Sequence, residues 1–464
     1  MEMNESSAKA KEVPKEKDSI KKVKVRCHLF FDGTLNNRTN IEQRLLSVSE
    51  TKLTEEERVE ASDLKVKYDA KQQSRAKERY DEFGSEFKED ENSYEGYYTN
   101  IVLLDRYADD VQEYDLTVRA YVEGSGTINM NEDKTKGFAF AKGESGVKQK
   151  VEKGLEHILM EFRSNINRKD VVKKLTFDVF GFSRGAASAR YFIHCALLDE
   201  KSIAKRLQDE GFNVSKVEVC FAGLFDTVST YGYSVAIGLA NNVSDLKLNA
   251  ISHAKQTIHL TAADEHRKYF SLTNIKSAGG KGKEFYLPGV HSDIGGGYRD
   301  NATEKLKIFK TSRLSSAENE KKRLIELGWY QDDELDILKR WVKDPGGKRN
   351  KLKVALVTNR ENILNHYSKI PLHIMVKYAK ENKLEFVDKL ERDEEIHSDL
   401  DNVKQEIDQY ISSGGKSKAT DWHSNDKSWL SKLRHDYFHF SARYKIGHDP
   451  RFSSGRRYRK VYNG

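Results

Sequence analysis

Short apolar runs alternate with longer amphipathic stretches over the first 300 or so residues of the chain. Two of the longer stretches, 98–114 and 147–162, have the helical spacing of apolar residues. The short runs favour strands because they are rich in β-branched and aromatic residues; they are 23–31, 115–122, 174–181, 216–223, 256–262 and 284–288. The segments between them suit crossover helices. The pattern therefore predicts an α/β fold with a mostly parallel sheet covered by helices on both faces.

The polar pattern predicts three regions. Residues 1–22 are rich in Glu, Lys and Ser without an apolar segment, which predicts a disordered tail. Residues 23–305 carry the predicted strands, and a charged, proline-free stretch of helix formers at about 41–95 predicts a helical insertion. Residues 306–464 predict a mainly helical region that completes or covers the core. Within it, 317–342 has the spacing of two helices joined by a turn.

Composition narrows the class of protein. Only 37% of the 464 residues are hydrophobic and 33% are charged, so the core is modest for the length. No run of about 18 apolar residues predicts a spanning helix, and the N-terminus lacks the apolar segment of a Sec signal. We expect synthesis in the cytoplasm. The three cysteines fall in predicted strands or a predicted helix and indicate core packing, not disulfides or a metal site: Cys27, Cys195 and Cys220.

The net charge of +7 favours anionic partners such as phospholipid headgroups. Much of the excess lies in a basic tail, 443–464, where cationic and aromatic side chains alternate. Such a tail is typical of a membrane-surface or nucleic-acid contact, or of a solvated terminus with a few docked aromatic residues. We favour the last interpretation and expect no nucleic-acid partner.

One motif indicates nucleophilic catalysis. Gly181-Phe-Ser183-Arg-Gly185 follows the predicted strand 174–181 and precedes a helix-compatible stretch, 186–198. A strand, G-x-S-x-G and a helix in this order form a nucleophile elbow, in which glycine is needed because other side chains collide with the tight turn. The motif predicts Ser183 as a nucleophile at the positive end of a helix.

A serine hydroxyl needs a histidine to take its proton and a carboxylate to hold that histidine. Asp226 follows the predicted strand 216–223, and His291 lies at the entrance of a glycine-rich loop after another strand. Serine, acid and histidine then follow in the order of an α/β-hydrolase. Four further histidines lie in helix-like or strand-like runs and fit structural roles better: His194, His253, His259 and His266.

Two other acids are candidates for the carboxylate that holds the histidine. Asp226 also fits a different role, that of a helix cap. Asp293 is second in rank because it lies only two residues from the histidine, a short reach to the ring nitrogen Nδ1. Asp264 is third, because its neighbours Glu265 and Arg267 indicate a structural charge network.

An acyl intermediate carries an oxyanion that needs two aimed donors. We expect one to be the backbone N–H of Arg184 and the other to come from Gly33 or Thr34, in the turn after the first strand. Asp32 in that turn either fixes the loop or borders the site. The segment also suggests the Asp-x-Asp-Gly-Thr motif of haloacid-dehalogenase-type phosphatases, but Phe30 occupies the position of their nucleophile and excludes that chemistry.

Several local motifs together resemble the first family of type VI secretion lipase effectors, which are α/β-hydrolases. They occur in order at 30–37, 121–127, 181–190, 224–228, 263–267, 288–298, 367–372 and 437–442, so the resemblance covers nearly the whole chain. The insertion at 41–95 has no counterpart.

The resemblance implies a phospholipase A-type serine esterase acting on membrane glycerophospholipids, with no metal or other cofactor. It also implies an immunity protein and a secretion spike protein as partners, and export to the periplasm of target cells. Two alternatives stay open: a soluble esterase or peptidase of the same fold, and a catalytically silent binding module. Residues 230–250 either line an acyl-chain groove or, as we favour, pack in the core.

Overall fold

The computed structural model describes residues 20–84, 92–133, 146–230, 242–343, 350–415, 422, 428–445, 447–453 and 455–464. Most of the predicted disordered tail, 1–19, lies outside the described residues, as do 231–241 of the predicted acyl-groove segment. Within the described part of the chain, no helix is both long and apolar enough to cross a bilayer.

A seven-stranded parallel sheet forms the centre of the molecule, in the order β2-β1-β3-β5-β6-β8 with β4 beside β3. Its strands are β1 (Lys22–Phe31), β2 (Leu116–Val122), β3 (Val171–Phe182), β4 (Asn213–Val214), β5 (Val217–Phe225), β6 (Ala254–Ala262) and β8 (Gly282–Leu287). Each of the six predicted strands occurs, and the predicted α/β class is confirmed.

Side chains of each strand alternate between two apolar layers. In β1, Cys27 and Leu29 pack in the layer under α6 (Val147–Asn165) and α7 (Arg184–Leu197), whereas Phe30 faces the opposite layer. Helices α4 (Asn100–Tyr107) and α12 (Lys369–Glu381) contact that opposite face. Because both faces are covered, the central strands are buried along most of their length, as parallel strands usually are.

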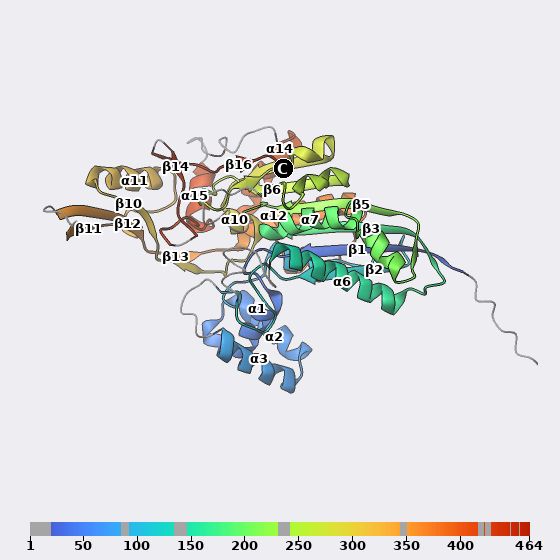
Figure 1. Cartoon of the computed structure of the whole chain (residues 1–464). Coiled ribbons are helices and arrows are strands. Elements are labelled where there is room, and N and C mark those ends of the chain that lie inside the picture. The colour runs from blue at the N-terminus through green and yellow to red at the C-terminus, as the bar shows by residue number, and fades with distance from the viewer. Residues whose placement is uncertain are drawn as a thin grey trace, which may run out of the picture.

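The insertion after β1 is helical and lies beside one edge of the molecule in Figure 1. It contains α1 (Arg38–Ser47), α2 (Glu55–Lys67) and α3 (Ala70–Phe83). The last two begin with capping boxes, Thr54 with Glu57 and Asp69 with Gln72, in which each side chain bonds to the other residue's backbone N–H.

The prediction of two helices over 317–342 is wrong for its second half. The first helix is α11 (Leu314–Glu326), but β11 (Leu335–Lys343) is a strand that pairs with β12 (Asn350–Thr358). Together with β10 (Lys307–Thr311) they form a three-stranded antiparallel sheet at the end of the molecule (Figure 1). The region after 305 is therefore mixed instead of mainly helical.

The remaining elements connect these layers. They are α8 (Ile203–Asp209), β7 (Leu272–Thr273), α10 (His291–Gly295), β9 (Ala302–Glu304), β13 (Arg360–Ile363), α13 (Lys389–Asp393), α14 (Asp401–Ser412), α15 (Ser428–Asp436), β14 (Phe452–Ser453), β15 (Arg456–Arg457) and β16 (Val461–Tyr462), with short 3-10 helices at 50–52, 248–253, 276–281, 332–334, 366–368 and 398–400.

Candidate active site

Ser183 occupies the sharp turn between β3 and α7. Its φ of 59° and ψ of −123° lie in a region of backbone conformation that residues other than glycine rarely adopt, so the turn stores strain. A Cβ at Gly185 would lie 2.1 Å from the carbonyl oxygen of Phe31, and one at Gly181 would lie 2.4 Å from that of Gly185. Only glycine fits at both positions, which is the packing that a nucleophile elbow requires.

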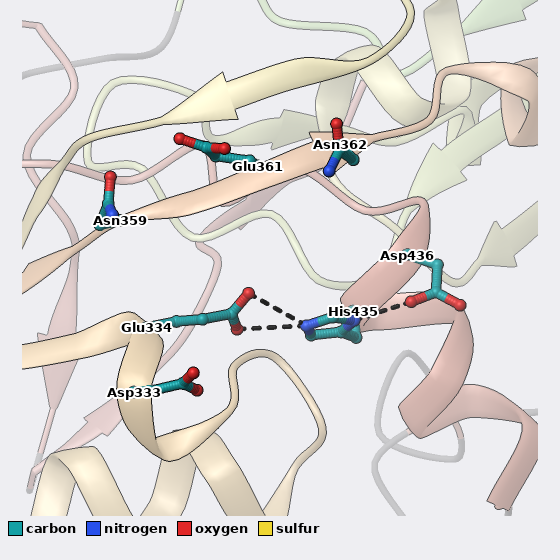
Figure 2. Close-up of a pocket in the computed structure, with 7 residues that line it drawn as sticks. All are labelled: Asp333, Glu334, Asn359, Glu361, Asn362, His435 and Asp436. Carbon is teal, nitrogen blue, oxygen red and sulfur yellow. Dashed lines mark hydrogen bonds and ion pairs between the residues drawn. The ribbon is translucent and has the colours of Figure 1, made fainter.

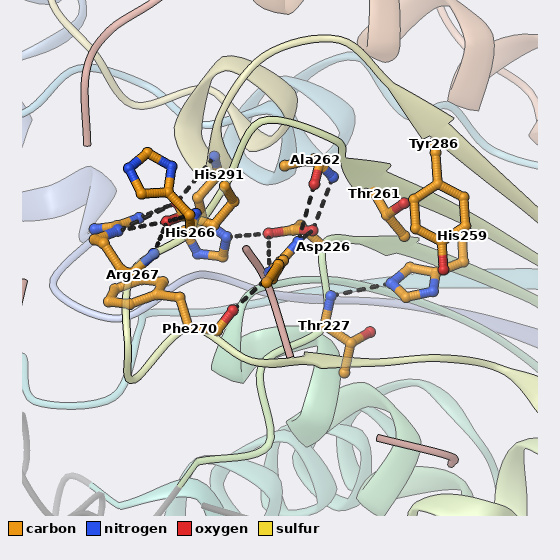
Figure 3. A network of polar contacts seen from close by, with 12 residues as sticks. Asp226, Thr227, His259, Thr261, Ala262, His266, Arg267, Phe270, Tyr286 and His291 are labelled. Carbon is orange, nitrogen blue, oxygen red and sulfur yellow. Dashed lines mark hydrogen bonds and ion pairs between the residues drawn. The ribbon is translucent and has the colours of Figure 1, made fainter. Parts of the chain in front are cut away.

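Asp226 and His291 meet at the carboxyl edge of the sheet. Asp226 directly follows β5 and is fully buried. Its Oδ2 contacts Nδ1 of His291, and its Oδ1 accepts the N–H of Ala262 at 2.9 Å (Figure 3). The structure thus brings together the predicted acid and the predicted histidine. The acid contacts Nδ1 of the imidazole, so Nε2 is the ring nitrogen that it does not engage.

The imidazole of His291 lies beside the elbow. Its ring centroid is 4.6 Å from that of Phe182, the residue before Ser183, and 5.0 Å from that of Phe270. The loop after Asp226 also reaches the elbow, because the N–H of Val228 donates to the carbonyl oxygen of Ser183 at 3.2 Å. Serine, acid and histidine therefore come from three neighbouring loops at one edge of the sheet.

The acid and the histidine have opposite responses to burial. Burial alone would raise the pKa of Asp226, but the charges of Arg459 and His291 hold it well below its usual range. Burial lowers the pKa of His291, and contact with Asp226 opposes this only in part. Near neutral pH the pair is therefore a carboxylate and a neutral imidazole, the state in which the histidine accepts a proton.

The two rival acids have other partners. Asp264 accepts the N–H of Gly289 at 2.8 Å and forms an ion pair with Arg434, so it ties together two loops of the site. Asp293 accepts the N–H of Val290 at 2.8 Å, and burial raises its pKa well above the usual range. Neither has a described contact with the ring of His291.

The charge network expected around Asp264 is present. Arg267 donates to both carboxylate oxygens of Glu265, with a shortest distance of 2.8 Å. The same carboxylate lies near the N–H of His291, at 3.4 Å, and thus supports the histidine from its backbone side.

The turn after β1, which carries the two candidates for a second oxyanion donor, lies against the elbow. The N–H of Gly33 donates to the carboxylate of Asp32 at 2.7 Å, so it is already engaged. Among the described contacts, the N–H of Thr34 has no acceptor, and the hydroxyl of Thr34 accepts a bond from the guanidinium of Arg184. Of the two candidates, Thr34 is therefore the better donor.

Asp32 is buried among neutral donors. Besides Gly33, the hydroxyls of Thr99 and Tyr121 donate to it at 2.7 and 2.6 Å. Burial raises its pKa to about 6 despite these bonds. Asp32 fixes the turn that carries Thr34, and it has no described contact with His291.

One residue of the site has no signal in the sequence. The guanidinium of Arg459, from the predicted basic tail, bonds to both carboxylate oxygens of Asp226, at 2.6 and 2.8 Å. The tail is folded onto the protein at this point, with 8% of that side chain exposed, whereas Tyr458 is 41% exposed.

An acidic cavity of about 520 Å³, lined by none of these residues, lies on the C-terminal region (Figure 2). Its lining is polar: Asp333, Glu334, Asn359, Glu361, Asn362, His435 and Asp436. The imidazole of His435 bonds to Glu334 and Asp436. Among the described residues, no three His, Cys, Asp or Glu side chains are grouped as metal ligands would be.

Comparisons with known proteins agree with the motifs. The family model of the Tle1-like phospholipase effector catalytic domain of type VI secretion systems matches residues 197–318, a segment that contains Asp226 and His291. This match confirms the predicted resemblance to those effectors over that segment. No sequence among the curated proteins matches.

Solved structures match over more of the chain. The structure described as the Tle1 effector bound to the VgrG spike from the type VI secretion system covers 99% of this chain and 98% of its own, at a TM-score of 0.60 and 22% identity. An uncharacterized protein from Pseudomonas aeruginosa covers 88% of this chain and 56% of its own, at a TM-score of 0.41 and 16% identity. The first of these matches shows the fold.

Proposed function

We propose that this chain, which resembles the Tle1-like phospholipase effectors of type VI secretion in its motifs and in its match to their family model, is a serine esterase that hydrolyses acyl esters of membrane glycerophospholipids. The proposed triad is Ser183, His291 and Asp226. The observation that carries the proposal is the strained conformation of Ser183 on its glycine-flanked turn, directly beside the buried pair of Asp226 and His291.

In the acylation step, Oγ of Ser183 attacks the ester carbonyl carbon while Nε2 of His291 takes the hydroxyl proton. Asp226 holds the imidazole through Nδ1 and stabilises the imidazolium that forms. The backbone N–H groups of Arg184 and Thr34 stabilise the tetrahedral oxyanion. Collapse of this intermediate breaks the bond to the alcohol oxygen, which leaves as a lysophospholipid with the proton from His291.

In the deacylation step, water attacks the acyl-serine and gives its proton to His291. The second tetrahedral intermediate collapses to a free fatty acid, and His291 returns the proton to Oγ of Ser183. The pKa of His291 is lowered, so its imidazole stays neutral at pH values at which an ordinary histidine is already protonated. A neutral imidazole is ready to take the proton in both attacks.

Ser183→Ala tests the nucleophile. We expect it to abolish fatty-acid release from phospholipid vesicles, because no other group replaces the attacking oxygen. Ser188→Ala is the matched control: it removes a buried hydroxyl from the same helix, one that bonds only to the carbonyl oxygen of Arg184 in the described contacts, and we expect it to retain activity. Undiminished release by the Ser183 variant would contradict the proposal.

The surface that we propose to meet the membrane is the hairpin of β11 and β12. Trp341 is 67% exposed on one face of β11 and Leu338 is 53% exposed on the other, and exposed cations flank both: Lys339, Arg340, Lys343, Lys351 and Lys353. Aromatic and aliphatic side chains enter the lipid interface while cations attract anionic headgroups. The hairpin suits this contact better than the basic tail, whose Arg459 is committed to Asp226.

Trp341→Ala tests that surface. We expect about tenfold slower hydrolysis of anionic vesicles, because one large apolar contact with the interface is lost, and unchanged hydrolysis of a short soluble ester. Met160→Ala, which removes an exposed apolar side chain from α6 at 58% exposure, is the matched control and should change neither rate. Equal effects of the two substitutions on vesicles would refute the assignment of the hairpin.

The proposed delivery follows from the same relatives. The solved relative of similar fold is described as bound to a VgrG spike. We extend this to a spike-type carrier for the present chain, to release in the periplasm of target cells, and to an immunity protein in the producing cell. Co-purification with the spike protein of the producing strain tests the carrier, and protection of sensitive cells by a co-expressed neighbouring gene tests the immunity protein.

A further inference from the structure

The last residues of the sequence contact the proposed active site. Strand β16 pairs in parallel with β7, in the register Val461 to Leu272 and Tyr462 to Thr273. Backbone bonds continue along this contact, because the N–H of Leu272 donates to Lys460 at 2.9 Å and that of Ser277 donates to Gly464 at 2.8 Å. The segment is therefore held by regular strand pairing.

This pairing places Arg459 against the carboxylate of Asp226. Its two terminal nitrogens donate to Oδ1 at 2.6 Å and Oδ2 at 2.8 Å, which is the bidentate geometry of an arginine fork. Its Nε donates to the carbonyl oxygen of Phe270 at 2.8 Å, and Nη1 is 3.2 Å from that of Ala262. The guanidinium is thus fixed from several sides.

The geometry points to Arg459 as a positioning residue of the triad: it fixes the plane of the Asp226 carboxylate, so that Oδ2 faces Nδ1 of His291, and its positive charge offsets the negative charge that Asp226 places beside that histidine. This inference rests on the proposed function of the site. In the resting state, Asp226 shares its negative charge between a fixed arginine and the imidazole.

The remaining charges around His291 pair with one another. Glu265 lies at its backbone N–H and binds Arg267, while the faces of the imidazole meet the rings of Phe182 and Phe270. A change of charge at position 459 therefore acts on the imidazole mainly through Asp226. Loss of the arginine leaves an uncompensated carboxylate beside the ring, which stabilises the imidazolium and raises its pKa.

The test compares full-length Arg459→Ala, Arg459→Lys and Arg457→Ala with the wild type. Arg457 is the matched control: it lies in the same segment, its side chain is 7% exposed, and it binds Glu320 at 2.9 Å instead of the proposed triad. The measurement is the second-order rate of Ser183 labelling by a fluorophosphonate from pH 5 to pH 9, with the melting temperature of each variant.

We expect Arg459→Ala to label about 10- to 100-fold more slowly, because the imidazole is less well placed. The acid limb of its pH profile should move up by about one pH unit. Arg459→Lys keeps the charge but not the fork, so its rate should fall while its acid limb stays in place. Arg457→Ala should keep the acid limb of the wild type.

A wild-type rate and acid limb in Arg459→Ala would overturn the inference. Equal losses in the Ala variants of both arginines, with neither acid limb moved, would also overturn it, because that pattern indicates docking of the tail alone. If Arg459→Ala does not fold, Arg459→Lys decides: a wild-type rate in it overturns the role of the fork. Absence of Ser183 labelling in the wild type would refute the proposed function itself.

Discussion

The loops after β1 and β5 each place a buried aspartate at the carboxyl edge of the same sheet, but their carboxyl groups have opposite pKa shifts. Asp32 is 2% exposed and burial raises its pKa to about 6. Asp226 is fully buried, yet its pKa lies well below the usual range. Desolvation acts on both in the same direction, so burial does not account for the difference.

The partners account for it. Asp32 accepts bonds from one backbone N–H and two hydroxyls, all neutral. Asp226 accepts the fork of Arg459 and the ring nitrogen of His291. Neutral donors satisfy a buried carboxylate without balancing its charge, whereas a paired cation does both. An aspartate held with a cation remains ionised and is available to orient a histidine.

The same substitution at both positions gives the largest expected contrast. Asp226→Asn should lower kcat for ester hydrolysis about 10⁴-fold, because an amide does not hold the imidazole in the required tautomer. Asp32→Asn should leave most of the activity, since its amide oxygen still accepts the bonds of Gly33 and Thr99 and its amide nitrogen can donate to the hydroxyl of Tyr121. Steady-state kinetics on variants shown to be folded by thermal melting provide the measurement. Similar losses in both would remove the distinction between the two loops.

Asp32→Asn should also raise stability, by about 1–3 kcal/mol at pH 7.5. The folded-state pKa of Asp32 lies above its unfolded value, so the carboxyl group contributes stability below about pH 4, and that contribution is lost as the pH rises through about 6. Asparagine carries no such charge. Urea unfolding at several pH values checks this, and a stability gain that persists unchanged at pH 4 would contradict it.

Tyr121→Phe should have the smallest effect. The substitution removes the hydroxyl that donates a hydrogen bond to Asp32. The carboxylate is then less well solvated, and its pKa rises further. The hydroxyl also accepts the N–H of Arg38 at 3.1 Å, and that bond is lost at every pH. We therefore expect the loss above pH 6 to exceed the loss below pH 4 by about 1 kcal/mol. The same unfolding series measures it, and a loss that does not vary with pH would indicate a packing effect only.

The sheet and the chemistry at its edge were predictable because both depend on local patterns. Buried parallel strands are rich in apolar residues, and the loops that follow them gather at the same edge of the sheet. Ser183, Asp226 and His291 follow such strands or their loops, so the sequence indicates them as a group. Their roles in catalysis stay predictions.

The C-terminal region was less predictable. In β11, the apolar residues Leu335, Leu338 and Trp341 satisfy helical spacing, but the segment pairs with β12 and is a strand. In a strand, Leu335 and Ile337 lie on the same face because they are two residues apart. Arg459 gives no local signal at all. It is one of several cations in the tail, and its partner lies 233 positions away along the chain.

The most direct test of the account is the site of covalent labelling. Wild-type protein is treated with a fluorophosphonate and digested, and the modified residue is located by mass spectrometry, with Asp226→Asn treated in parallel. The account predicts a single phosphonylated residue, Ser183, formed much more slowly in the variant. A label on any other residue, or equal rates for the two proteins, would contradict it.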